Sequence, residues 1–108
     1  MNDIIRKHVI LELQDYQSNR QLLVRLAHEL KGGGMVRSRQ YMAILHRMMA
    51  IKNGIVAAGY EGKMIYTLRY LKKQSWVAIS LKLHMGEATV KRKHVLLLQS
   101  VAESLGWV

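Results

Sequence analysis

The residues best suited to chemical contacts stand together near the C-terminal end, in the stretch Gly-Glu-Ala-Thr-Val-Lys-Arg-Lys-His-Val at 86–95. At helical spacing, one face of this stretch presents Gly86, Glu87, Ala88, Lys91, Arg92 and Val95. A carboxylate on that face can accept a hydrogen bond from cytosine N4, while lysine and arginine can donate to guanine or to phosphate. Thr89 and Lys93 lie beside the face, where side chains suit phosphate contacts. We therefore predict that a helix over 87–98 enters the major groove of double-stranded DNA.

A helix can work in this way only if a second helix holds it at a fixed angle, and residues 76–98 have the pattern for this. The pattern predicts two short helices joined by a tight turn, with four apolar residues buried between them: Ile79, Leu83, Met85 and Val90. Ala78 and Ser80 are small, which allows the two helices to approach closely. Ser75 precedes the first helix and is predicted to cap it.

The residues of the turn between these helices, at 84–86, suit the backbone conformations that such a turn needs. His84 stands where the backbone needs a positive φ, at a cost on the order of 1 kcal/mol for a residue other than glycine. Gly86 is an acceptable N-cap for the second helix, and Glu87 suits the positive end of the helix dipole. Met85 and Val90 have the spacing of a hydrophobic staple. These local features all indicate the same structure.

Basic residues are concentrated around this unit. Residues 63–94 contain eight Lys or Arg and one acidic residue, Glu87, which gives a net charge of +7 out of +10 for the whole chain of 108 residues. Such a concentration favours polyanionic partners through electrostatic steering and counterion release. Lys72, Lys73 and Lys82 are predicted to make supporting phosphate contacts. The alternative is a helical hairpin with an ordinary basic surface.

Residues 76–105 resemble the helix-turn-helix of region 4 of sigma-70 factors. With the closing Ala-Glu-Ser-Leu-Gly-Trp at 102–107 in a small basic chain, they also resemble phage late-gene transcriptional activators of the RinA and ArpU kind. The resemblance implies DNA binding and, as in some members of that family, action with RNA polymerase. The chain departs from the pattern at four positions, where His84 replaces glycine, Ser80 alanine, Gly86 a serine or threonine cap, and His94 an apolar residue. The first 60 residues match only in size and helical character.

The first part of the chain is predicted to be a helical scaffold over 1–60, packed with 61–108 into one compact all-α domain. A helix over about 2–31 carries a heptad-like stripe of Val9, Leu13, Tyr16, Arg20, Leu23, Ala27 and Leu30. The stripe fits packing within the domain, or a homo-oligomer built on a coiled coil, and the polar segment 15–19 would allow a break. Three glycines at 32–34 should end the helix.

Two more helices are predicted before the C-terminal pair. The first starts at its N-cap Ser38, extends to about residue 58 and is weakened or ended by Gly54 and Gly59. Its broad apolar face comprises Tyr41, Ile44, Leu45, Met48, Met49, Ile51, Ile55 and Val56. The methionines in this face fit a core, or an adaptable binding surface. The second helix, over 61–73, should turn Met64, Ile65, Leu68 and Leu71 inward and Lys63, Arg69, Lys72 and Lys73 outward.

Several functional classes find no support in the sequence. The chain has no Cys, and its five His residues form no His-x-x-x-His pair, so we expect no metal site and no cofactor. The acidic residues have the spacing of helix-surface charges and no Ser stands in a nucleophile elbow, so we do not expect an enzyme. No apolar run approaches the roughly 20 residues of a membrane span, and no signal peptide is evident. We expect a protein of the bacterial cytoplasm, associated with the nucleoid.

Three functions are compatible with this pattern. The favoured one is a DNA-binding regulator of transcription. The second is a protein-interaction or assembly module that multimerises through the N-terminal helix. The third is DNA recognition for phage packaging, as in terminase small subunits. Two-fold symmetric DNA sites need dimers, whereas region-4-like modules bind singly, so either stoichiometry fits.

Overall fold

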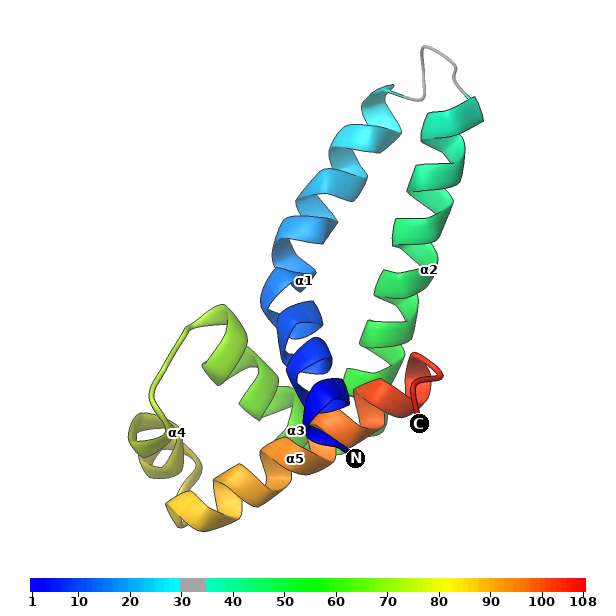
Figure 1. The fold of residues 1–108 in the computed structure, drawn as a ribbon. Coiled ribbons are helices and arrows are strands. Elements are labelled where there is room, and N and C mark those ends of the chain that lie inside the picture. Colours follow the sequence, from blue (N-terminus) through cyan, green and yellow to red (C-terminus); the bar gives the residue numbers. More distant parts are fainter. Residues whose placement is uncertain (30–34) are drawn as a thin grey trace.

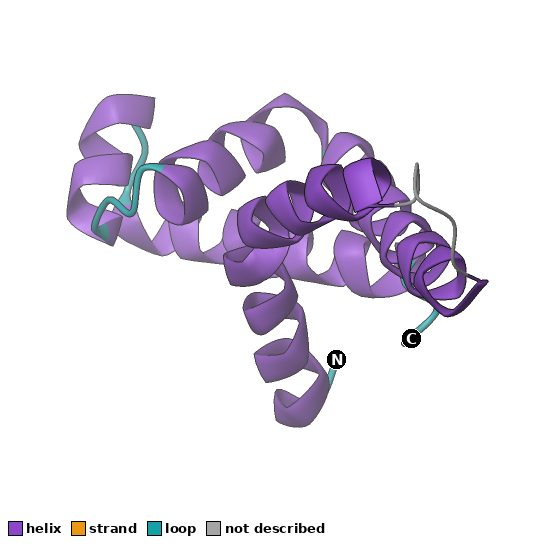
Figure 2. Cartoon of the chain, turned by 90° about the horizontal axis from the view of Figure 1, so that it is seen from above, coloured by secondary structure: helices purple, strands orange, loops and turns teal. Residues whose placement is uncertain are grey.

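The computed structural model of the chain describes residues 1–29 and 35–108, and these are almost entirely helical (Figure 1). The elements in chain order are α1 (Asp3–Glu29), α2 (Met35–Ala57), α3 (Gly59–Tyr66), the π-helical turn η2 (Thr67–Leu71), α4 (Trp76–Leu83) and α5 (Glu87–Ser104). No strand occurs among the described residues, as Figure 2 also shows. The prediction of an all-α chain is confirmed.

α1 and α2 form a long hairpin, and the shorter elements gather at its base (Figure 1). The molecule is consequently elongated, with principal extents of 52 × 27 × 21 Å. α5 lies across the base and contacts α1, α2, α3 and α4, so the other elements assemble around it. None of the helices within 1–29 and 35–108 combines the length and the apolar composition that crossing a membrane requires.

One hydrophobic core joins the base of the hairpin to the C-terminal elements. Its largest fully buried side chains are Leu13, Ile51, Ile65, Leu68, Ile79, Leu97 and Leu98, with Val9, Val90 and Val101. Burying an aliphatic side chain of this size stabilises the fold by roughly 1.5–3 kcal/mol relative to leaving it exposed. Because residues of both 1–60 and 61–108 contribute, side-chain packing fixes the angle of α4 and α5 to the hairpin.

A very close approach between helices occurs at Gly54, where α2 packs against α5. A Cβ atom at Gly54 would lie 2.6 Å from the Cα of Val101, and the Ser100 hydroxyl donates to the Gly54 carbonyl over 2.7 Å. Gly54 does not end its helix, the stronger of the two predicted effects, because α2 continues through it to Ala57. This glycine instead leaves the space that contact with the α5 backbone needs. Gly59, with a φ of +82°, does stand where α2 gives way to α3.

Two predicted features of the scaffold helices need correction. Ser38 is not an N-cap, because α2 already begins at Met35 and Ser38 lies within it. The polar segment 15–19 does not break α1, which is continuous and begins with the Asn2 side chain accepting from the Ile5 N–H over 2.8 Å. A long helix is held by packing along one face, so a short polar segment does not end it. The predicted helix end at 32–34 lies outside the described residues.

The heptad-like stripe of α1 does not stay on one buried face. Val9 and Leu13 are buried, Tyr16 and Leu23 are half-buried, Arg20 and Ala27 are exposed, and Leu30 lies outside the described residues. Farther along α1, Leu26 is buried instead. The physical reason is that α1 packs against α5 as well as α2, and only the base of the hairpin reaches α5, so its buried face rotates along its length.

α2 also buries only part of its predicted apolar face. Met48, Ile51 and Ile55 are buried, and Tyr41, Ile44 and Leu45 are half-buried. Met49 and Val56 were expected on the same face, but their side chains are 53% and 60% exposed. α2 therefore has apolar residues on two sides, of which the other described residues cover one.

The π-helical turn η2 changes the face that the third predicted helix presents. The Lys72 N–H donates to the Thr67 carbonyl over 3.0 Å, five residues back, which widens the turn. The prediction that Leu71 points inward is wrong, since the wider turn shifts the side-chain register and leaves Leu71 45% exposed. Arg69, predicted to remain outside, is half-buried with its guanidinium 4.2 Å from the ring centre of Trp76.

Candidate nucleic-acid interface

The N-terminus of α4 is capped as the sequence predicts. Ser75 has an extended backbone, with φ −69° and ψ 161°, and its hydroxyl oxygen accepts from the Ala78 N–H over 3.1 Å. A serine cap satisfies one of the backbone donors that the first turn of a helix leaves free. α4 is short, with only eight residues, so its position depends on this cap and on packing.

Residues 84–86 join α4 to α5 in a tight turn. His84 is left-handed, with φ 55° and ψ 42°, and its N–H donates to the Ser80 carbonyl, which also accepts from Met85 over 3.1 Å. Gly86 is extended, with φ −64° and ψ 149°, and its carbonyl accepts from the Val90 N–H over 3.0 Å. Two predictions are confirmed here: the positive φ at His84 and the N-cap at Gly86.

The apolar residues of the α4–α5 pair fix the two helices against the core. Ile79 and Val90 are fully buried, while Leu83 and Met85 are half-buried and pack against the same cluster. These are the four positions that the sequence predicts as buried. The angle between α4 and α5 is therefore set by side chains that also belong to the core of the whole molecule.

The first turns of α5 face solvent. Five of the predicted contact residues are exposed, namely Gly86, Glu87, Ala88, Lys91 and Arg92. Thr89 and Lys93, predicted beside that face, are half-buried. Val95, predicted on the exposed face, is also half-buried, so this face ends about one turn earlier than expected.

Two of the three basic residues at 91–93 are engaged in ion pairs. Lys91 Nζ lies 3.3 Å from Glu87 Oε1 one turn earlier, and both side chains are about half exposed. Lys93 Nζ lies 2.5 Å from Glu61 Oε2, which draws it towards α3. Exposed pairs of this kind contribute about 0–1 kcal/mol, so they open readily for another anion. Within the described part of the chain Arg92 forms no ion pair.

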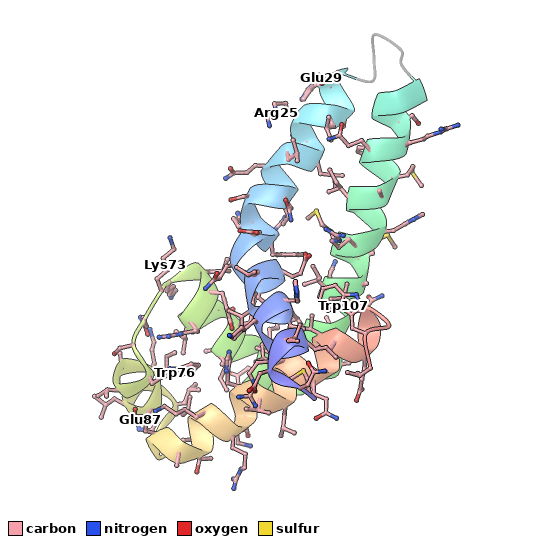
Figure 3. All side chains as sticks on the ribbon, in the orientation of Figure 1. Arg25, Glu29, Lys73, Trp76, Glu87 and Trp107 are labelled. Atoms are coloured by element: carbon pink, nitrogen blue, oxygen red, sulfur yellow. The ribbon has the colours of Figure 1, made fainter. Side chains whose placement is uncertain are left out.

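The three predicted supporting lysines, Lys72, Lys73 and Lys82, are all exposed. Figure 3 shows Lys73, Trp76 and Glu87 along one edge of the molecule, away from the tip of the hairpin. Lys73 is left-handed, with a φ of 53°, and lines a cavity of about 510 Å³ together with Arg69, Tyr70 and Gln14. The predicted supporting lysines are thus exposed at both ends of α4, with Lys72 and Lys73 before it and Lys82 in its last turn.

A buried aromatic cluster around His94 holds α5 against the preceding elements. The His94 Nε2 atom and the Tyr70 hydroxyl are 2.6 Å apart, and the His94 ring lies 4.7 Å from that of Trp76 at 63°. Arg69 stacks over Trp76 and donates to the Gln74 carbonyl over 3.0 Å. The cluster therefore links η2, the N-terminus of α4 and the middle of α5.

Burial determines the charge of this cluster. It lowers the pKa of His94 to about 4, with nearby Arg69 and Arg6 acting in the same direction. Burial also raises the pKa of Tyr70 to about 12. At neutral pH the phenol thus keeps its proton and the imidazole is uncharged, and the tautomer of His94 sets which of the two groups donates in the hydrogen bond. His94 packs as an uncharged core residue and adds no positive charge to α5.

Sequence reasoning identified His94 as a histidine in a commonly apolar position, but it did not find the partner. Tyr70 lies 24 residues earlier, on an element whose π-helical geometry the pattern of apolar residues does not indicate. The feature of the sequence that could have indicated such a partner is a single histidine at a core position of a basic helix. A histidine in that position needs a hydrogen-bond partner, and Tyr70 supplies it.

Comparison with known proteins adds no relative. No protein-family model matches the chain, and no curated protein or solved structure is significantly similar to it. The likeness of residues 76–105 to sigma region 4 accordingly rests on their sequence pattern alone, and the geometry and charge of α4 and α5 are the structural features that bear on function.

Proposed function

We propose that the chain binds double-stranded DNA, with α4 and α5 acting as a helix-turn-helix and α5 lying in the major groove. The observation that carries the proposal is the geometry of the pair, two helices joined through a left-handed His84 with the first turns of the second exposed. In this motif the N-terminal residues of the second helix contact base edges.

The exposed residues of α5 suit different parts of the DNA. Arg92 is the best candidate for a bidentate contact to guanine, since it is exposed and forms no ion pair within the described residues. Glu87 would accept from cytosine N4 once it leaves Lys91, which then becomes available to phosphate. Thr89 and Lys93 stand at the edge of the exposed face and suit backbone contacts.

The supporting lysines would anchor the duplex on both sides of α4. Lys72 and Lys73 precede the helix and Lys82 lies in its last turn, all three exposed. Phosphate contacts of this kind position a protein on DNA without distinguishing sequences. They also release counterions, so binding should weaken steeply as salt increases.

We assign this DNA binding to the regulation of transcription in a bacterial cell, with RNA polymerase as a second partner. Support for this step comes from the resemblance of residues 76–105 to sigma region 4 and to phage activators of the RinA and ArpU kind. The resemblance covers only the C-terminal part of the chain, so the hairpin takes no role in this assignment.

The proposal is tested by selecting bound duplexes from a random DNA pool and measuring the affinity for the selected sequence at several salt concentrations. The test variant is Lys91→Ala with Arg92→Ala. The matched control, Lys7→Ala with Arg25→Ala, removes the same charge from exposed positions on α1. Figure 3 shows Arg25 near the tip of the hairpin, far from α4.

The α5 variant should bind the selected DNA about 10- to 100-fold more weakly, because a good base contact contributes about 1–3 kcal/mol. Its log–log salt slope should fall by about 1, because Lys91 is the phosphate contact, and the loss of Arg92 should relax the sequence preference at the base that it contacts. The α1 control should keep the slope and the sequence preference. The proposal fails if the wild-type chain binds no DNA at low salt, or if the two variants lose affinity equally.

A further inference from the structure

A second basic surface occupies the corner between α1, α2 and α3. One cation from each helix, Arg20, Lys52 and Lys63, lines a cavity there of about 340 Å³. The remaining lining residues are aromatic, aliphatic or hydroxylic, and none is acidic: Tyr16, Ile55, Val56, Tyr66, Thr67 and Leu71. We refer to this cavity and its three cations as the basic corner.

The basic corner continues into an exposed apolar stripe along α2. Met42, Met49 and Val56 are 42%, 53% and 60% exposed, and Val56 also lines the corner. Their seven-residue spacing places them nearly on one line along the helix, in the pattern that a partner helix follows. Single exposed apolar residues are ordinary, but an aligned row beside a cavity indicates a contact surface.

The basic corner faces away from α5. Gly54 of α2 packs against Val101 of α5, and a Cβ at Gly62 of α3 would lie 3.9 Å from Leu97, so these positions mark the sides turned towards α5. Lys52 lies two residues before Gly54 and Val56 two residues after it. Each side chain therefore points roughly 200° around the α2 axis from Gly54, on the side opposite to α5. A straight DNA duplex bound on the exposed face of α5 would thus not contact the basic corner as well.

We propose that the stripe and the basic corner together bind an acidic amphipathic helix of a partner protein. Apolar residues of that helix would pack along the α2 stripe, and its carboxylates would pair with the three cations of the corner. Methionine is flexible and polarizable, so Met42 and Met49 can adapt to a partner surface. Figure 1 shows that, among the described elements, only α1 and the elements at the base lie beside α2.

Charge selects this partner over a second copy of the chain. α2 contains no Asp or Glu, and its exposed basic residues include Arg39 and Lys52, while Arg47 pairs with Glu12 of α1 over 3.4 Å. Two α2 helices packed together would bring like charges into contact, which is unfavourable. A small anion is also a poorer match, since the apolar stripe extends along the helix well beyond the cavity. An elongated ligand with acidic flanks satisfies both features.

The test uses a displayed library of random 20-residue helical peptides, selected on the immobilised full-length chain. Selected peptides are then titrated against the wild type and two variants with the same change of charge, Lys52→Glu with Lys63→Glu and Lys72→Glu with Lys82→Glu. All four lysines are exposed, and circular dichroism melting is used to check that both variants fold. DNA binding is measured on the same three proteins.

We expect the selected peptides to carry apolar residues at heptad spacing flanked by Asp or Glu. Their affinity should fall at least about tenfold for the variant of the basic corner and change less than about threefold for the other, because only the former places like charges in the contact. The inference is overturned if the peptides lack acidic residues, or if the basic-corner variant binds them as the wild type does.

DNA binding on the same proteins separates this inference from the proposed function. The Lys72 and Lys82 variant should lose more DNA affinity than the basic-corner variant. If the basic-corner variant loses as much or more, the corner is a DNA contact and the docking surface is wrong. A chain that binds the peptides through the corner but no DNA would contradict only the proposed function.

Discussion

The base of the molecule and the outer half of the hairpin are built differently. At the base, α5 packs against four other helices and the buried side chains form one cluster. In the outer half, Leu26 of α1 is buried but lies outside that cluster, where only α1 and α2 run side by side (Figure 1). The difference indicates that packing against several elements fixes α4 and α5 at the base, whereas the outer hairpin depends on contacts between α1 and α2.

Truncating one leucine in each region should show this difference most strongly. Leu98→Ala, at the fully buried centre of the base, should lower the free energy of unfolding by about 3–4 kcal/mol, because four packed helices cannot collapse onto the cavity. Leu26→Ala should cost about 2 kcal/mol, since two helices can shift and solvent can enter. Urea unfolding followed by circular dichroism measures both values. Equal losses would show that the hairpin is as tightly packed as the base.

The base also contains a buried polar residue, His94, and this should make its stability depend on pH. The unfolded histidine has a pKa near 6.5, whereas burial lowers the pKa in the folded state to about 4. Between these two pH values the unfolded chain binds a proton that the folded chain does not. The contribution of neutral, buried His94 to the free energy of unfolding is therefore fully present above pH 6.5 and is lost as the pH falls towards 4. At pH 4.5 the loss should be about 2 kcal/mol.

A His94→Phe variant isolates this effect from the titration of carboxylates. The variant should be less stable at pH 7, by about 1 kcal/mol, because the Tyr70 hydroxyl loses its hydrogen-bond partner. It should, however, lose less stability than the wild type when the pH is lowered from 7 to 4.5. Urea unfolding of both proteins at the two pH values gives the comparison. Identical pH dependence in the two proteins would mean that His94 titrates normally in the folded chain.

The same contrast explains how much the sequence predicts. The α4–α5 pair depends on local features, and each of these was predicted: the Ser75 cap, the left-handed His84, the Gly86 cap and the burial of Val90. Such features act over a few residues, so the sequence of the segment alone contains them. The helices were expected as well, with most boundaries displaced by a few residues, but α5 continues to Ser104, six residues past the predicted end at 98, and the helix predicted over 61–73 is α3 followed by η2.

Features that depend on distant parts of the chain were missed or misjudged. Gly54 looks like a helix breaker in sequence, and only contact with Val101, far along the chain, gives it another role. Met49 and Val56 look like core residues because their types and spacing resemble those of Met48 and Ile55, yet the hairpin leaves them exposed. Neither the side of a helix that finds a partner nor the register shift of η2 can be inferred from periodicity alone.

Substitutions in the turn that joins α4 to α5 should have a smaller effect on the free energy of unfolding. His84 has a φ of 55°, which costs a residue other than glycine on the order of 1 kcal/mol. His84→Gly relieves that strain but gives the unfolded chain more freedom, so the net gain should be about 0.5 kcal/mol. His84→Ala keeps the strain without the tolerance of histidine for this region, and should be less stable than the wild type. Thermal melting of the three proteins therefore gives the order glycine, histidine, alanine; a less stable glycine variant would show that the imidazole itself stabilises the turn.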